Sequence, residues 1–151
     1  MVARINRLVM AFGTFEILHP GHLSYFRSAR GMGNRLIVVV ARDSSVRAIK
    51  GREPAINERG RLALVKSLRL VDIAVLGNRF ATNKQKYSII LKYKPDVVAI
   101  GYDQKVDVDD LKRYLKENGM RTTVVRIGKP YKEGVFKGSA IREKLAAGER
   151  A

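Results

Sequence analysis

The sequence of 151 residues contains no cysteine and no tryptophan. Without cysteine the chain has neither a disulfide framework nor a thiolate metal site. It also lacks any apolar run of the ~20 residues that a transmembrane helix requires. Its first residues show neither the long apolar region nor the small-residue cleavage pattern of a signal peptide. These absences predict a protein of the cytoplasm that does not enter a membrane.

Acidic residues are scarce, since 14 Asp and Glu stand against 30 Lys and Arg and leave a net charge of +16. Such an excess favours anionic partners, namely nucleotides, phosphates or nucleic acid. A basic surface suited to a particular cell interior is the other explanation. A domain that binds nucleic acid without catalysis would carry aromatic residues interleaved with a basic stripe. The sequence has no such stripe, so this function is kept only as a second alternative.

Short apolar runs alternate with amphipathic stretches along the whole chain. Runs of this kind are typical of strands buried on both faces of a parallel sheet, and the length suits one domain. The sequence therefore predicts a single α/β domain over residues 1–151, Rossmann-like and doubly wound, with a five-stranded parallel sheet. The expected strands are 8–12, 36–41, 73–76, 97–100 and 122–127. Helical spacing covers 22–30, 62–68, 88–91, 111–115 and 139–147, and the charged segment 42–58 is given no element of its own.

Both histidines of the chain lie in the stretch GTFEILHPGH, residues 13–22, where the first strand gives way to a helix. Glycines there let the backbone approach a ligand, and a helix that begins near Gly21 offers free N–H groups to an anion. His19, His22 and the Thr14 hydroxyl can donate hydrogen bonds to the same phosphate. Zinc binding would need a third ligand, and none is nearby, so no metal ligand is expected. The stretch predicts a phosphate cradle that lacks the lysine of a P-loop.

Further polar residues follow other predicted strands, at the edge where parallel α/β sheets bind their ligands. Asp103 follows the fourth strand, where it caps a loop or faces water unless a ligand binds there. In the basic segment 42–61 a solvated face explains most of the charges, while Lys50 and Arg61 are expected to neutralise triphosphate charge. Tyr131 either packs its loop or contacts a nucleotide, and Ser139 is expected to cap the last helix beside the ligand.

The pattern Gly13-Thr14-Phe15 followed by His19-Pro20-Gly21-His22 resembles the H-x-G-H signature of the nucleotidyltransferase superfamily related to class I aminoacyl-tRNA synthetases. Within that superfamily the cytidylyltransferase-like branch is most similar, because RLALVKSLRLVD (61–72) resembles its second arginine helix. ARDSSVRAIKGREP (41–54) and GYDQ (101–104) are similar to the archaeal FAD synthases. The resemblance extends from about residue 8 to residue 145.

This resemblance implies that an adenylyl group passes from ATP to FMN by direct in-line attack, giving FAD and pyrophosphate. Mg²⁺ or another divalent cation would be carried by the triphosphate, and a homodimer is compatible with the resemblance. A cytidylyltransferase acting on glycerol 3-phosphate, or another cofactor adenylyltransferase, is the alternative. The flavin slot is expected from Tyr131, Val135 and Phe136. The residues assigned to catalysis are His19, His22, Lys50 and Arg61, and those assigned to nucleotide binding are Thr14, Phe15, His19, Pro20, Gly21, His22, Asp103, Tyr131 and Ser139.

Overall fold

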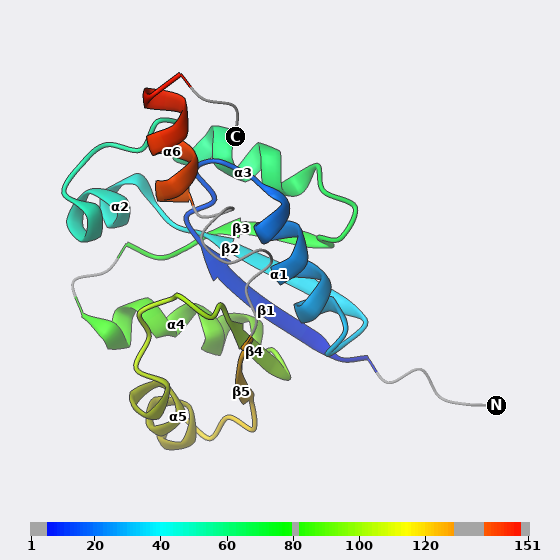
Figure 1. The fold of residues 1–151 in the computed structure, drawn as a ribbon. Helices are drawn as coiled ribbons and strands as arrows, with labels where there is room; N and C mark the ends of the chain where they lie inside the picture. The colour runs from blue at the N-terminus through cyan, green and yellow to red at the C-terminus, as the bar shows by residue number, and fades with distance from the viewer. Residues whose placement is uncertain (1–5, 80–81, 129–137, 149–151) are drawn as a thin grey trace.

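The computed structural model describes residues 6–79, 82–128 and 138–148, with no side-chain detail for 138–140, and Figure 1 shows its fold. Strands and helices alternate along the chain as the sequence predicts. The strands are β1 (Leu8–Gly13), β2 (Arg35–Val40), β3 (Ile73–Leu76), β4 (Val97–Ile100) and β5 (Thr123–Arg126). The helices are α1 (Pro20–Arg30), α2 (Asp43–Lys50), α3 (Glu58–Lys66), α4 (Asn83–Tyr93), α5 (Val108–Glu117) and α6 (Gly138–Ala146).

The five strands form one parallel sheet in the order β3-β2-β1-β4-β5, which confirms the predicted doubly wound α/β fold. Apolar side chains from α1 and α3 pack on one face, and those from α4 and α5 pack on the other. The strand order reverses between β1 and β4, because the chain first adds strands on one side of β1 and then on the other. Ligands of such sheets bind beyond the carboxyl ends of the strands at this switch.

At the amino ends of the strands, side chains bond to the backbone of the sheet. Asp96 accepts a hydrogen bond from the Leu8 backbone N–H (2.8 Å), and Asp72 accepts one from the Leu36 N–H (2.7 Å) while pairing with Arg30. These carboxylates satisfy the Leu8 donor at the start of β1 and the Leu36 donor near the start of β2. The carboxyl ends of the strands are therefore the ends that remain available for a ligand.

The segment 42–58 differs from expectation because it contains the helix α2. Only Val46 among its apolar residues is buried, so the helical period is not visible in the apolar pattern. Gly51 ends this helix in the left-handed region (φ 67°), a conformation that glycine adopts without strain. Helix α4 likewise begins earlier than its apolar residues indicate, because Thr82 caps it through the Gln85 N–H (3.3 Å). No helix within the described ranges is long and apolar enough to cross a bilayer.

Candidate active site

A cavity of about 1020 Å³ opens at the carboxyl ends of the strands, between the start of α1, helix α2 and the loop that follows β4. Most of the residues predicted for the site lie on its wall. Those are Thr14, Phe15, His19, Gly21, His22, Lys50 and Asp103. Arg42, Arg52, Asn78, Lys86 and Arg142 also line it and were not predicted. Tyr131, Val135 and Phe136 lie outside the described residues, as does the side chain of Ser139.

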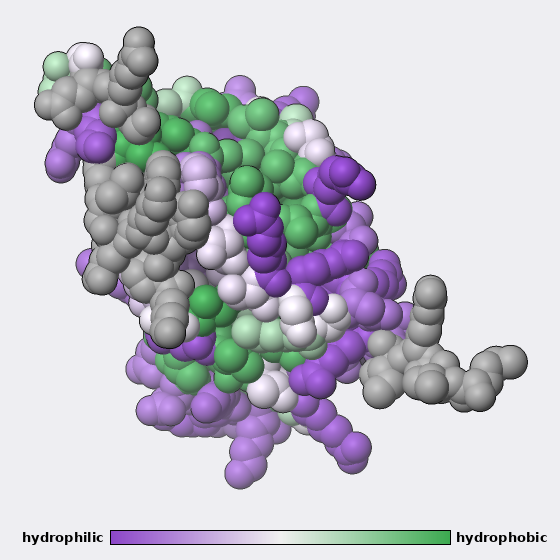
Figure 2. Space-filling model, turned by 45° about the vertical axis from the view of Figure 1, so that its right-hand side comes forward, coloured by the Kyte–Doolittle hydropathy of each residue, from purple (hydrophilic) through white to green (hydrophobic). Residues whose placement is uncertain are grey.

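Much of the positive charge lies away from this cavity. Figure 2 shows hydrophilic side chains over the end of the molecule that α4 and α5 form. Exposed lysines and arginines on and beside these two helices account for part of it, namely Lys84, Lys92, Lys94, Lys112, Arg113 and Lys116. The net charge is thus divided between a solvated surface and a smaller group of cations at the cavity.

His19 is the N-cap of α1, and its Nδ1 accepts a hydrogen bond from the Gly21 N–H (3.1 Å). A ring nitrogen that accepts cannot carry the proton, so the neutral ring is protonated at Nε2. Burial lowers the pKa of His19, and the Asp103 carboxylate partly opposes that effect. His19 is therefore a neutral ring with its proton on Nε2, at a helix N-terminus where the backbone dipole favours anions.

His22 stacks on His19 with ring centroids 3.8 Å apart and meets the edge of Phe15 at 5.2 Å. Burial, followed by the nearby His19 and Lys50 charges, lowers the pKa of His22 to about 3. Its Nδ1 is buried and has no hydrogen-bond partner within the part of the chain that the structure describes. Both histidines are consequently neutral at pH 7, and one of them retains an unused polar atom.

Phe15 and Pro20 shape the start of α1 through packing and backbone conformation. Phe15 is only 3% exposed, adopts φ 54°, and packs against His22 and Phe26. A Cβ on Gly13 would come within 2.5 Å of the Phe15 ring, so glycine is required there. Pro20 begins α1, where its fixed φ suits the first turn, and it lies outside the described cavity wall.

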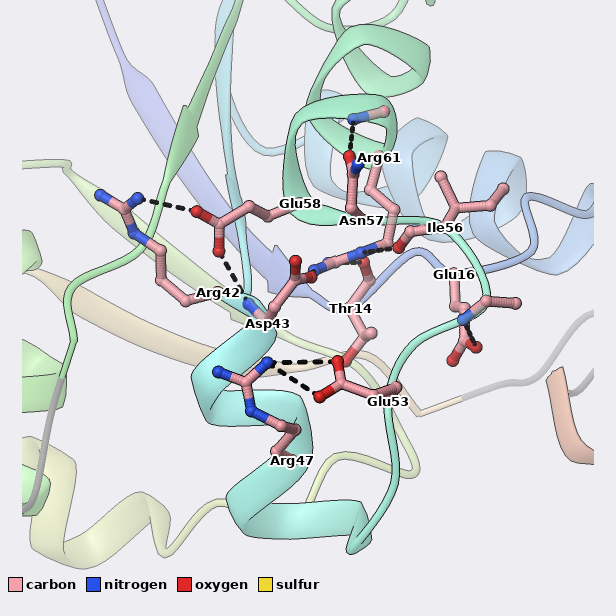
Figure 3. A network of polar contacts seen from close by, with 12 residues as sticks. Thr14, Glu16, Arg42, Asp43, Arg47, Glu53, Ile56, Asn57, Glu58 and Arg61 are labelled. Carbon is pink, nitrogen blue, oxygen red and sulfur yellow. Dashed lines mark hydrogen bonds and ion pairs between the residues drawn. The ribbon is translucent and has the colours of Figure 1, made fainter.

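Arg61 does not face the cavity, which corrects the expectation that it neutralises triphosphate charge directly. Its side chain is 0% exposed. The guanidinium donates to the Ile56 carbonyl (2.9 Å), the Thr14 carbonyl (2.7 Å) and the Asp43 carboxylate (2.7 Å). Figure 3 shows these bonds joining the loop after β1, the start of α2 and the loop before α3. Arg61 is a positioning residue, because its charge is already matched inside the protein.

A second group of contacts in Figure 3 fixes the start of α2. Glu58 accepts bonds from the Asp43 N–H (2.8 Å) and from Arg42 (3.1 Å), and Arg42 also donates to the Gly77 carbonyl (2.9 Å). The bond from the Asp43 N–H is the largest cause of a lowered Glu58 pKa. Arg42 was expected on a solvated face. It instead connects the end of β3 to α3, while Arg47 pairs with Glu53 at the surface as expected.

Glu16 is a buried carboxylate that the sequence did not single out. It accepts bonds from Arg52 (3.0 and 3.1 Å), from the Ala55 N–H (2.7 Å) and from Arg142 of α6 (2.5 Å). Burial by itself would raise the pKa of Glu16, but these donors outweigh it and lower the pKa to about 2. Glu16 therefore stays ionised and orients two arginines that line the cavity.

Lys50 completes what we term the cationic cluster, formed by Lys50, Arg52 and Arg142 around Glu16. Burial lowers the pKa of Lys50, the Glu16 charge raises it, and the two arginines lower it again. Three cations against one carboxylate leave an excess of positive charge beside the two neutral histidines. Such an arrangement fits a polyanion, because arginine and lysine donors match phosphate oxygens. Arg52 is exposed, as expected for most of this basic segment, and it also lines the cavity.

The sheet separates between β1 and β4 at the same end of the molecule. Backbone pairing of these strands stops at Ala11 and Ala99. Beyond that point the Tyr25 hydroxyl donates to the Ala99 carbonyl (2.6 Å) and accepts from the Phe12 N–H (3.3 Å). Gln104 donates to the Phe12 carbonyl (2.5 Å) and accepts from the Gly101 N–H. Two side chains thus replace the missing strand pairing and keep the gap open.

Two histidines alone do not complete a tetrahedral metal site. Among the described residues there is no group of three or more His, Asp or Glu side chains that could hold a metal ion. The buried carboxylate of Glu16 already accepts hydrogen bonds from two arginines and one backbone N–H.

Comparison with known proteins agrees with the geometry. A family model described as cytidylyltransferase-like matches residues 10–144. The FAD synthase of Thermoplasma acidophilum is 42% identical over 137 residues, which are 91% of this chain and 92% of that protein. The FAD synthase of Methanohalobium evestigatum is 48% identical over 121 residues, 80% of this chain and 77% of that protein.

Solved structures share the fold. A Thermoplasma volcanium protein described as a lipopolysaccharide core biosynthesis protein has a TM-score of 0.76 at 39% identity, covering 83% of this chain and 98% of that one. Thermotoga maritima TmcAL, solved with alpha-thio ATP, has a TM-score of 0.71 at 15% identity, covering 94% of this chain and 51% of that one. At 15% identity the likeness concerns the fold alone. From the family model and the near full-length relatives, the chain belongs to the cytidylyltransferase-like family of nucleotidyltransferases, as its H-x-G-H motif predicts.

Proposed function

We propose that this protein transfers the adenylyl group of ATP to FMN, giving FAD and pyrophosphate. The observation that carries the proposal is the identity of 42% and 48% to two FAD synthases, over most of each chain. The cavity supports it, because neutral donors and a cationic cluster stand together at the switch in strand order. A nucleoside triphosphate needs both kinds of group along its length.

In the proposed reaction an oxygen of the FMN phosphate attacks the α-phosphorus of ATP in line. The new P–O bond forms as the bond from the α-phosphorus to the oxygen bridging to the β-phosphorus breaks. Pyrophosphate leaves with that oxygen and its electron pair, so no side chain becomes covalently attached. Catalysis then consists of positioning the two phosphates and stabilising charge on their oxygens.

Each part of the site has a role in that step. His19, through its Nε2–H, and His22 donate to phosphate oxygens together with the first N–H groups of α1. The cationic cluster stabilises the negative charge that develops on pyrophosphate as it leaves. Thr14 adds a hydroxyl, and Asp103 contacts the nucleoside. We also assign Tyr131 and Ser139 to nucleotide binding. The substrate is MgATP, with the cation held largely by triphosphate oxygens.

The test is a panel of substrate pairs with the purified protein and Mg²⁺. FAD is followed by chromatography and pyrophosphate by a coupled assay, with the double variant His19→Ala, His22→Ala as the control for contaminating activity. ATP with FMN should yield both products in equal amounts, and CTP with glycerol 3-phosphate should yield little. Pyrophosphate from CTP and glycerol 3-phosphate alone would refute the FMN assignment. Absence of pyrophosphate from every pair would refute the enzymatic function itself.

A further inference from the structure

Arg126, the last residue of β5, holds three backbone carbonyls of the loop that follows β4. Its guanidinium donates to the carbonyls of Gly101 (3.1 Å), Gln104 (2.9 Å) and Val106 (2.9 Å). One side chain on the edge strand thus contacts the beginning, middle and end of a six-residue loop. Arginine suits this task, because its planar fork can aim several donors at once.

The loop is also tied to the centre of the sheet. Gln104 reaches the Phe12 carbonyl of β1 (2.5 Å) and the Gly101 N–H (2.9 Å), and within the loop the Val106 N–H donates to the Gln104 carbonyl (2.9 Å). The loop is therefore fixed on one side by β1 and on the other by Arg126. Its conformation is set by hydrogen bonds within the chain.

Asp103 lies between these fixed points. It is exposed, lines the cavity with Tyr102, and stands close enough to His19 for its charge to act on that ring. The hydrogen bonds that fix the loop to β1 and to Arg126 therefore determine where Asp103 lies relative to His19. Arg126 belongs neither to this loop nor to the described wall of the cavity. It therefore holds the loop from outside the site.

We propose that Arg126 is a positioning residue for the nucleotide end of the site, fixing the loop that carries Asp103 opposite His19. The proposal rests on the proposed function in that the nucleotide is ATP. Without the guanidinium the three carbonyls turn to water and the loop samples other conformations. Binding of ATP must then order the loop, which weakens ATP binding and leaves the phosphate chemistry at His19 and His22 unchanged.

The experiment compares Arg126→Gln, Arg126→Lys and the control Arg113→Gln, which removes an exposed arginine of α5 paired only with Asp110 among its described ion pairs. For Arg126→Gln the KM for ATP should rise about tenfold, equivalent to ~1.4 kcal/mol, with kcat and the KM for FMN within about twofold. Arg126→Lys should recover part of the loss. Hydrogen exchange of the amides in 101–106 should quicken in Arg126→Gln and stay unchanged in Arg113→Gln.

Two results would overturn the proposal. One is an unchanged KM for ATP in Arg126→Gln, and the other is a fall in kcat with faster exchange throughout the sheet, which marks a merely structural role. If Arg126→Gln does not fold, the same measurements on Arg126→Lys decide. If the parent protein forms no FAD, the proposed function fails separately, and the Kd for ATP from equilibrium dialysis decides: a Kd raised by Arg126→Gln supports the proposal and an unchanged Kd refutes it.

Discussion

Replacing Glu16 with glutamine removes one negative charge from a buried position while keeping the size of the side chain. Glu16 is 5% exposed and receives hydrogen bonds from Arg52, Arg142 and the Ala55 N–H. In glutamine one carboxylate oxygen becomes an amide group that can only donate, so it faces these donors without accepting. The substitution therefore breaks the charge pairing and leaves a donor opposed to donors.

The pKa of Glu16 gives the size of the effect. Burial alone would raise that pKa, but the donors lower it from 4.5 to about 2. A lowered pKa stabilises the folded state fully above the unfolded value, and the stabilisation is lost as the pH falls toward the folded value. The difference between the two values corresponds to roughly 3 kcal/mol at pH 7. At pH 3 the unfolded carboxyl is mostly protonated, and the contribution falls to about 1.4 kcal/mol.

Urea unfolding followed by far-UV circular dichroism at pH 7 and pH 3 measures this difference. We expect Glu16→Gln to lower the free energy of unfolding by roughly 3 kcal/mol at pH 7, and by about half of that or less at pH 3. Glu53→Gln is the matched control, because Glu53 is 69% exposed and its pair with Arg47 should contribute only ~0.5 kcal/mol. Equal losses in the two variants at pH 7, or a loss at Glu16 that does not shrink at pH 3, would refute the reasoning.

Three further predictions concern the cradle and its support. His19→Ala and His22→Ala should each lower kcat by ~10²–10³ with an unchanged circular dichroism spectrum, because each removes a preorganised donor to phosphate; near-normal turnover would exclude that role. Arg61→Ala should lower the free energy of unfolding by about 3–5 kcal/mol in urea, since it leaves buried partners unpaired, while the exposed Arg47→Ala should cost about 0.5 kcal/mol or less. Because the pKa of His22 is about 3 and that of His19 is below its usual value, kcat/KM should stay level as the pH falls from 8 through ~6.5. A decline with a midpoint near 6.5 that disappears in His19→Ala would contradict neutral histidines.

The sheet and the placement of the two histidines at the start of α1 could be predicted because their signals are local. Each strand is a continuous apolar run, and the two histidines lie within ten residues of each other after the first strand. Helix α2 was missed because its buried face reduces to Val46 and little else. A short, charged helix of this kind has no apolar period to detect.

The long-range contacts of the site could not be predicted in the same way. Arg52 and Arg142 both pair with Glu16, although about 90 residues separate the two arginines. The sequence around Glu16 gives no signal that predicts either partner. Arg61 was expected to face the triphosphate but is buried, because three segments fold around it. Which charges are buried and which are solvated is decided by tertiary contacts, and a single sequence carries little information on those.

The gap between β1 and β4 has a consequence for substrate binding. The Phe12 N–H and C=O are bonded to Tyr25 and Gln104 of the same chain. These two backbone groups are therefore satisfied without strand pairing and do not draw β1 and β4 together. A substrate that binds beside them does not have to supply hydrogen bonds to that part of the sheet.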